Sequence, residues 1–218
     1  MLETIIKILT KYGYMFAIGL GNTLWMALIS IVFGTIIGSF IAIGKLSRKK
    51  ILNVLTSIYI EVLRGTPMLL QLYLFWILLP KILPVTDLQC IIVALIINSS
   101  AYVAECIRAG IQAVDKGQKE AALSLGISEN NIMRKIIFPQ AIKNILPALG
   151  NEFIVMIKET SLASVFFCGE LMTQYKTIQS LTFKAIEPLL IVGIIYLFLT
   201  LVLSKLLQIF ERRLKESD

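Results

Sequence analysis

The amino-acid sequence predicts an all-α integral membrane protein with five transmembrane helices, in which residues 1–218 form a single domain. Of the 218 residues, 57% are hydrophobic and 16% are charged, and the mean hydropathy is +0.82. Soluble domains are about 45–50% apolar and about 25% charged, so this composition indicates a membrane protein. The apolar residues also gather in segments long enough for the roughly 20 helical residues that cross a bilayer.

The basic residues predict how these helices are oriented. Most of them lie in three hydrophilic zones, after the first apolar segment, in the middle of the chain and at its end. Cytoplasmic loops carry an excess of Lys and Arg, so we expect these zones and the C-terminus in the cytoplasm and the N-terminus outside. Aromatic residues are not interleaved with them, so the net charge of +7 does not indicate a nucleic-acid partner. The basic residues of the three zones are Lys45, Arg48, Lys49 and Lys50; Arg108, Lys116, Lys119, Arg134, Lys135 and Lys143; and Lys205, Arg212, Arg213 and Lys215.

The elements follow in order along the chain. Residues 1–12 place their apolar side chains on one helical face, which predicts an amphipathic helix in the membrane interface. Gly34 and Gly38 give the first span a face on which another helix can pack closely. Residues 112–140 form a cytoplasmic loop, and residues 170–187 form an external polar segment. The five spans are expected at residues 13–44, 51–80, 88–111, 144–167 and 188–210.

Charged residues inside the second and third spans come in pairs. Glu61 and Arg64 are three residues apart on one helical face, so we expect them to pair and to stabilise a kink at Gly65-Thr66-Pro67. Direct contact of this pair with a substrate is the alternative. Glu105 and Arg108 have the same spacing near the cytoplasmic end of the third span, where we expect a structural pair.

Two amide side chains lie within the same spans. Gln71 is seven residues from Arg64, on nearly the same face, and could reach a central cavity. Asn98 lies near the middle of the membrane, where an amide needs hydrogen-bonding partners. Contact with a ligand and a hydrogen bond between helices are both open for Asn98.

The fourth span carries two acidic residues on one stripe. Glu152 and Glu159 are seven residues apart, hence about 20° apart around the helix and about 10 Å apart along it. Met156 lies between them and Lys158 points away, so the two carboxylates need a cation, water or positive groups from other helices. We expect them to bind the positive group of a cationic amino acid. The expected substrate-binding residues are Glu152, Glu159, Asn98, Gln71, Thr160 and Ser161.

A structural role for the two acids is the competing interpretation. Glu159 would then pair with a basic residue on another helix, and Glu152 would form hydrogen bonds inside a dimer interface. A neutral polar substrate such as glutamine would fit equally well in that case.

The cytoplasmic loop contains the stretch EAALSLGISENNIMRKIIFP, which begins at Glu120. Its first residues favour a helix, which Gly126 ends about two turns later. Ser128 can cap a new helix with Glu129 in its first turn, and we expect Pro139 to interrupt that helix. A short charged helix between two apolar segments is poorly placed for a core and well placed to contact a partner.

This stretch, with its Glu-Ala-Ala, a glycine six residues after the glutamate and the later Ile-Ile-Phe-Pro, resembles the cytoplasmic loop of ATP-binding-cassette importer permeases. In that family the small helix docks in a groove of the ATPase subunit and transmits its closure. The resemblance implies that Glu120, Ala121, Ala122 and Gly126 couple this chain to an ATPase.

Two further stretches resemble the polar-amino-acid uptake branch of that family, of the histidine, glutamine and arginine type. One is the ExxRGTP of residues 61–67 with its later Gln, and the other is residues 98–126. The family usually has Asp where this chain has Glu159. The resemblance, over about residues 13–210, implies a multi-pass protein of a prokaryotic cell (inner) membrane. It also implies a second permease chain in a homodimer, two ATPase subunits and an extracytoplasmic amino-acid-binding protein.

We therefore expect the permease subunit of an ATP-driven importer for a polar amino acid, basic in preference (arginine, lysine or histidine), with glutamine as the alternative. The sequence has no P-loop signature, so ATP hydrolysis is expected on the separate ATPase subunit, and no cofactor is expected here. It has no His and no CxxC, which argues against a metal site. A stand-alone secondary transporter or channel is less favoured because inverted repeats are missing. A membrane-embedded enzyme would need a catalytic constellation that the sequence lacks.

Overall fold

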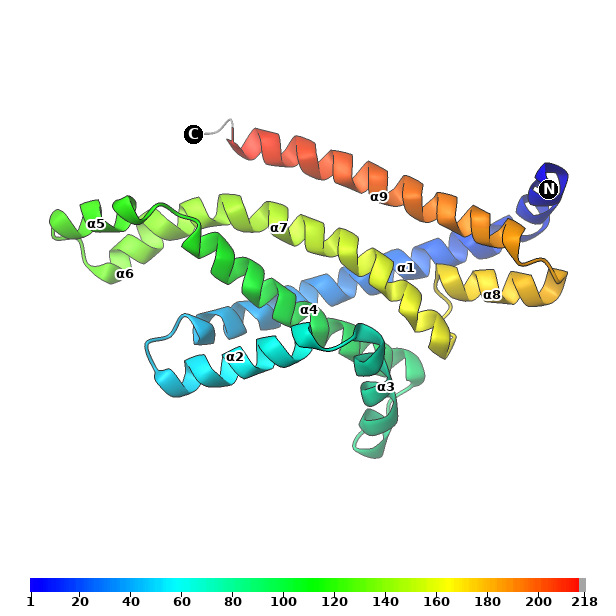
Figure 1. The fold of residues 1–218 in the computed structure, drawn as a ribbon, viewed down its shortest axis with the longest axis horizontal. Helices are drawn as coiled ribbons and strands as arrows, with labels where there is room; N and C mark the ends of the chain where they lie inside the picture. Colours follow the sequence, from blue (N-terminus) through cyan, green and yellow to red (C-terminus); the bar gives the residue numbers. More distant parts are fainter. Residues whose placement is uncertain (216–218) are drawn as a thin grey trace.

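The computed structural model describes residues 1–215, and its regular elements are all helices (Figure 1). The short helices α5 and α6 lie together at one end of the long axis, and α8 lies near the N-terminus at the other end. The elements are α1 (Leu2–Lys45), α2 (Lys50–Gly65), α3 (Met68–Leu78), η1 (Leu79–Lys81), α4 (Asp87–Gln112), α5 (Lys116–Ser124), α6 (Glu129–Ile132), η2 (Met133–Ile137), α7 (Phe138–Glu159), η3 (Thr160–Phe166), α8 (Leu171–Thr182) and α9 (Ile186–Lys215).

Helix α1 is unbroken over 44 residues, whereas the sequence predicted a separate helix over residues 1–12. The expected boundary was Gly13, which lies inside α1. A single interior glycine costs about 1 kcal/mol relative to Ala, which is too little to end a helix whose hydrogen bonds continue on both sides. That the first turns lie in the membrane interface stays a prediction.

Helices α1 and α4 approach each other closely through glycines. A Cβ atom added at Gly34 would lie 2.6 Å from the Ser99 Oγ, and one added at Gly38 would lie 2.7 Å from the Ser100 carbonyl oxygen. Neither position can therefore carry a side chain without moving α4. The close-packing face predicted for the first span is confirmed, and α4 is the helix that it contacts.

The second predicted span is sharply broken. Helices α2 and α3 meet at 108°, so residues 51–80 do not form the single kinked helix that we expected. Thr66 is extended, with φ −115° and ψ 147°, as sterics require of a residue before proline. Pro67 then precedes the first residue of α3. The predicted position of the kink is confirmed, and its size exceeds the prediction.

Helix α4 and the loop that follows it largely have the elements that were predicted. Helix α4 begins with a capping box between Thr86 and Gln89, close to the predicted start. Gly126, at φ +74°, lies two residues beyond α5, and Ser128 is the N-cap of α6. The prediction that Pro139 interrupts the next helix is wrong. Pro139 lies in the first turn of α7, where a missing N–H costs little, and the π-helix η2 joins α6 to α7.

The last third of the chain contains two unpredicted features. The fourth predicted span ends as an α-helix at Glu159 and continues as the 3₁₀-helix η3, whose C-cap Phe167 is left-handed at φ 52°. The external polar segment contains the helix α8. The fully buried Glu170 caps α8, because its carboxylate accepts hydrogen bonds from the Met172 and Thr173 backbone N–H groups. Acidic residues are favoured near helix N-termini, so Glu170 is a signal from which α8 could have been predicted and was not.

Among the described residues, α1, α4 and α9 are long and apolar enough to cross a membrane, and the bent pair of α2 and α3 would make a fourth span. Helix α7 has the necessary length, with 22 residues, but includes Lys143, Glu152, Lys158 and Glu159. The chain is therefore an all-helical membrane protein with three or four candidate spans. A fifth span would require that α7 crosses the membrane despite its charged residues.

The glycine contacts predict opposite effects of the same substitution at two positions of α1. Gly38→Ala should destabilise the protein by about 1–3 kcal/mol, because the new methyl group overpacks the contact with α4. Gly21→Ala should raise stability by up to about 1 kcal/mol, because no atom lies within 4 Å of its added Cβ and alanine favours the helix. Thermal unfolding of both variants in detergent checks the prediction, and equal melting temperatures would contradict it.

Candidate functional site

The acidic stripe of α7 faces the interior of the protein. Glu152 is only 7% exposed, and Met156, which lies between the two acids, is fully buried. Glu159 is half-buried at the end of α7, and its Oε2 has no hydrogen-bond partner among residues 1–215. Lys158 is exposed, as predicted. Within the described part of the chain, neither carboxylate forms an ion pair.

Gln71 and Asn98 are both buried, and they bind each other. The Asn98 Nδ2 donates a hydrogen bond of 2.9 Å to the Gln71 Oε1. The Gln71 Nε2 in turn donates to the Leu63 carbonyl oxygen at 2.7 Å and to the Thr66 Oγ1 at 2.9 Å. These bonds satisfy carbonyl and hydroxyl groups left by the break between α2 and α3, and they connect that break to α4. A hydrogen bond between helices is thus one role of Asn98.

The two polar residues after Glu159 differ in their surroundings. Thr160 is fully buried, and its Oγ1 donates to the Ile157 carbonyl oxygen at 2.7 Å. Ser161 is half-buried in the same 3₁₀-helix. Both residues lie in the first turn of η3, directly after Glu159.

Arg64 does not pair with Glu61, which corrects the sequence prediction. Its guanidinium lies 3.8 Å from the Glu105 carboxylate and 5.4 Å from the centre of the Tyr102 ring. Glu105 also pairs with Arg108, and that predicted pair is confirmed. Packing of α2 against α4 explains the difference, because Glu105 on α4 is a better-placed partner than a residue one turn away.

The loop between α4 and α7 presents a small helix, α5, with most of its surface open. All residues from Lys116 to Ala121 are exposed, and beyond them Leu125 is 80% exposed. Ala122 is the exception, because it is buried against Ile132 and Ile137. Among the residues predicted to couple to an ATPase, Glu120, Ala121 and Gly126 therefore face outward, whereas Ala122 packs inward and fixes α5 on its own loop.

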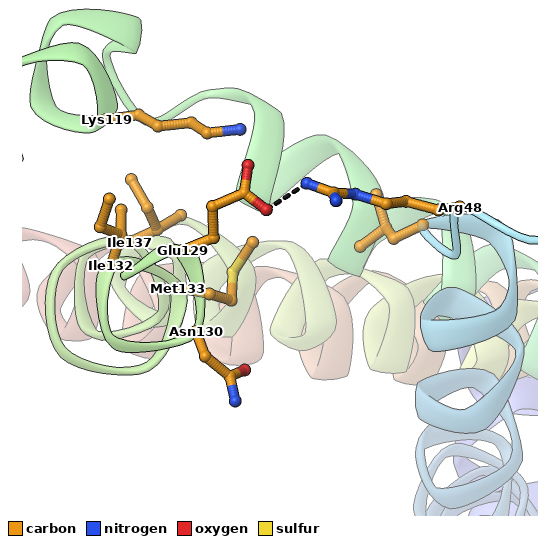
Figure 2. A pocket seen from close by; sticks show the side chains of 8 residues that line it. Arg48, Lys119, Glu129, Asn130, Ile132, Met133 and Ile137 are labelled. Atoms are coloured by element: carbon orange, nitrogen blue, oxygen red, sulfur yellow. Dashed lines mark hydrogen bonds and ion pairs between the residues drawn. The ribbon is translucent and has the colours of Figure 1, made fainter. Parts of the chain in front are cut away.

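The loop is also joined to the end of α1. Arg48, which follows α1, forms an ion pair with Glu129 at the start of α6 (Figure 2). Lys119 of α5 lies on the other side of Glu129 in the same view. These residues line a cavity of about 480 Å³ whose floor is formed by Ile132, Met133 and Ile137. We call this cavity the basic pocket.

Comparison with known proteins shows to which protein family this chain belongs. The sequence profile described as "Binding-protein-dependent transport system inner membrane component" matches residues 30–216. The chain belongs to this family. It is accordingly a multi-pass component of an inner membrane and the permease part of an ATP-binding-cassette transporter, not its ATPase.

Individual relatives agree with this assignment. The arginine transport system permease protein ArtQ of Bacillus subtilis (strain 168) is 40% identical over 92% of both chains. The glutamine transport system permease protein GlnP of Escherichia coli (strain K12) is 36% identical over 90% of this chain and 91% of that one. The resemblance to the polar-amino-acid branch is therefore confirmed.

Solved structures show the same fold. A crystal structure of an amino acid ABC transporter with histidines matches with a TM-score of 0.91 and 50% identity, covering 94% of this chain and 96% of that one. An inward-facing structure of the MetNI methionine ABC transporter has a TM-score of 0.77 over 92% of this chain and 96% of that one. At 18% identity the second comparison concerns the fold alone.

Proposed function

We propose that this permease forms the translocation path of an ATP-driven importer for a polar amino acid, with a preference for a basic one. The observation that carries the preference is the pair of acids on α7, Glu152 buried and Glu159 half-buried, with no ion-pair partner among the described residues. A guanidinium or ammonium group would supply the missing positive charge. The family relatives include proteins named for arginine and for glutamine at similar identity, so the site chemistry carries the preference.

A homodimer of permease chains is the assembly we propose, with two ATPase subunits in the cytoplasm and a binding protein outside. The arrangement needs five spans, with the N-terminus outside and the C-terminus in the cytoplasm. The basic zones support it: α4 leads into the basic central loop and α9 into the basic end of the chain, so α7 must cross in between. Its charged residues would then face a path or a partner chain and not lipid.

Thiol labelling tests this topology. After the three native cysteines are replaced, Lys81→Cys and Lys176→Cys should react with a membrane-impermeant thiol reagent in intact cells. Arg48→Cys and Lys116→Cys should react only after the cells are opened, because both positions lie in basic cytoplasmic zones. Labelling of position 116 from outside would overturn the five-span arrangement.

Helix α5 is the element that we expect to contact the ATPase. Its outer face carries Glu120 and Ala121, and Gly126 ends the element with a backbone conformation at φ +74° that side chains rarely adopt. Leu125, at 80% exposure, adds an apolar side chain to this surface. Closure of an ATPase groove around α5 would be carried to α7 through α6 and η2, which are continuous with it.

Substitutions at two neighbouring alanines, Ala121 and Ala122, distinguish an effect on ATPase coupling from an effect on folding of the loop. Ala121→Asp should leave the melting temperature unchanged and abolish substrate-stimulated ATPase activity of the reconstituted importer, since Ala121 is exposed on the docking face. Ala122→Asp should instead destabilise the loop by about 3–5 kcal/mol, because it buries an unpaired charge against Ile132 and Ile137. ATPase assays and limited proteolysis of both variants check this. Normal ATPase stimulation in Ala121→Asp would count against docking through α5.

The charge of Glu152 tests the substrate preference. Glu152→Gln should lower arginine affinity of the detergent-solubilised transporter about tenfold or more, because hydrogen bonds to charged groups contribute about 1.5–3 kcal/mol. Glutamine affinity should change little, and Glu187→Gln, at the start of α9, is the matched control. If arginine affinity is unmoved by Glu152→Gln, then Glu152 is structural and the basic preference is wrong.

A further inference from the structure

A second cavity, of about 510 Å³, lies between α1, α4 and α7 toward the cytoplasmic loop. Its wall is mostly aliphatic, with Ile43 of α1, Ile107 and Ile111 of α4, and residues of α7. The hydroxyl group of Ser39, which also lines it, donates to the Thr35 carbonyl oxygen at 2.7 Å. That polar group is therefore satisfied within α1 itself. We call this cavity the apolar groove.

The apolar groove adjoins the basic pocket of Figure 2. Leu46 and Met133 line both cavities, so one path leads from the aliphatic wall to the charged side chains. At the charged end, the Glu129 carboxylate lies between Arg48 and Lys119. Two cations thus face a single carboxylate, and the pocket retains one positive charge.

We propose that the apolar groove and the basic pocket together bind one anionic phospholipid of the cytoplasmic leaflet. The acyl chain would lie in the apolar groove between α1, α4 and α7. The phosphate would lie between Arg48 and Lys119, where it would replace Glu129 as the partner of the Arg48 guanidinium. This site differs from the substrate path, which the acids of α7 mark, and its lining includes Lys119 of α5 but neither Glu120 nor Ala121.

Charge complementarity selects this occupant among other amphiphiles. A guanidinium binds a phosphate through two parallel hydrogen bonds, so Arg48 can recognise the head group in a defined orientation. Basic residues next to membrane helices attract anionic head groups of the cytoplasmic leaflet, and Arg48 follows the end of α1 within three residues. A phosphodiester with one negative charge would neutralise the pocket, whereas a zwitterionic head group would bring a further cation close to Arg48 and Lys119.

Native mass spectrometry of the full-length permease in mild detergent tests the proposal. The probe is phosphatidylglycerol, compared with phosphatidylcholine that carries identical acyl chains. We expect one phosphatidylglycerol per permease chain, bound more tightly than phosphatidylcholine. Arg48→Gln should lower that affinity about fivefold, the effect of one basic residue at an anionic membrane surface. Lys119→Gln should have a similar effect.

Two further variants separate this site from general surface charge. Glu129→Gln should raise phosphatidylglycerol affinity, because it removes the carboxylate that competes for Arg48. Ser39→Leu should lower the affinity by filling the apolar groove while leaving the charges intact. The matched controls are Lys50→Gln and Arg134→Gln, two exposed cations that line neither cavity; they should bind the lipid as the unchanged protein does.

Several results would overturn the proposal. Equal retention of phosphatidylcholine would show that only the apolar surface binds lipid. An equal loss of affinity in the Lys50 and Arg134 controls would show an unspecific charge effect. Displacement of the lipid by inorganic phosphate at equal concentration would show a simple anion site. Because binding is measured in detergent, these outcomes do not depend on the transport function or on the orientation proposed above.

Discussion

A lipid bilayer offers no hydrogen bonds to the backbone, and this constraint organises the whole protein. Wherever a helix is interrupted, another group must satisfy the carbonyl and N–H groups that are freed. At the break between α2 and α3, the Gln71 amide binds the Leu63 carbonyl oxygen and the Thr66 hydroxyl group, and Asn98 fixes the amide from α4. The buried Gln71 side chain therefore joins α2 and α3 at their break and fixes both to α4.

The other interruptions coincide with the regions that we associate with transport. The π-helix η2 lies between α6 and α7, and the 3₁₀-helix η3 begins directly after Glu159. Both change the helical repeat and so rotate the side chains that follow; η2 runs on into α7, whereas η3 ends at the left-handed Phe167. In this way α7 can present Glu152 inward while its N-terminal end remains connected to α6.

The sequence predicted the parts of this fold that local rules govern. Apolar length located α1, α4 and α9, the proline rule located the break before Pro67, and the glycine rule located the end of the element at Gly126. Helical spacing placed the two acids of α7 on one stripe, and Glu152 of that stripe is buried in the structure.

The errors arose where contacts between distant residues decide the outcome. Arg64 pairs with Glu105 across two helices, although Glu61 is closer in sequence. The family resemblance implied that Ala122 contacts the ATPase, whereas Ile132 and Ile137 bury it. Helix α8 is held by Glu170, whose burial depends on surroundings that sequence spacing does not describe.

The unbroken helix α1 has a mechanical consequence. At 1.5 Å per residue, its 44 residues make a rod of about 66 Å, roughly twice the thickness of the hydrocarbon core of a bilayer. The rod touches α4 most closely near Gly34 and Gly38, and it touches α8 at Gly19. Along α1, the distance from the midpoint between Gly34 and Gly38 is about 26 Å to Gly19 and about 14 Å to Lys45. If α1 tilts as a rigid body about this contact, a displacement of its Lys45 end, imposed through Arg48 and Glu129, would appear at α8 in the opposite direction and about twice as large. A rigid α1 would in this way link movements of the loop between α4 and α7 to movements of α8.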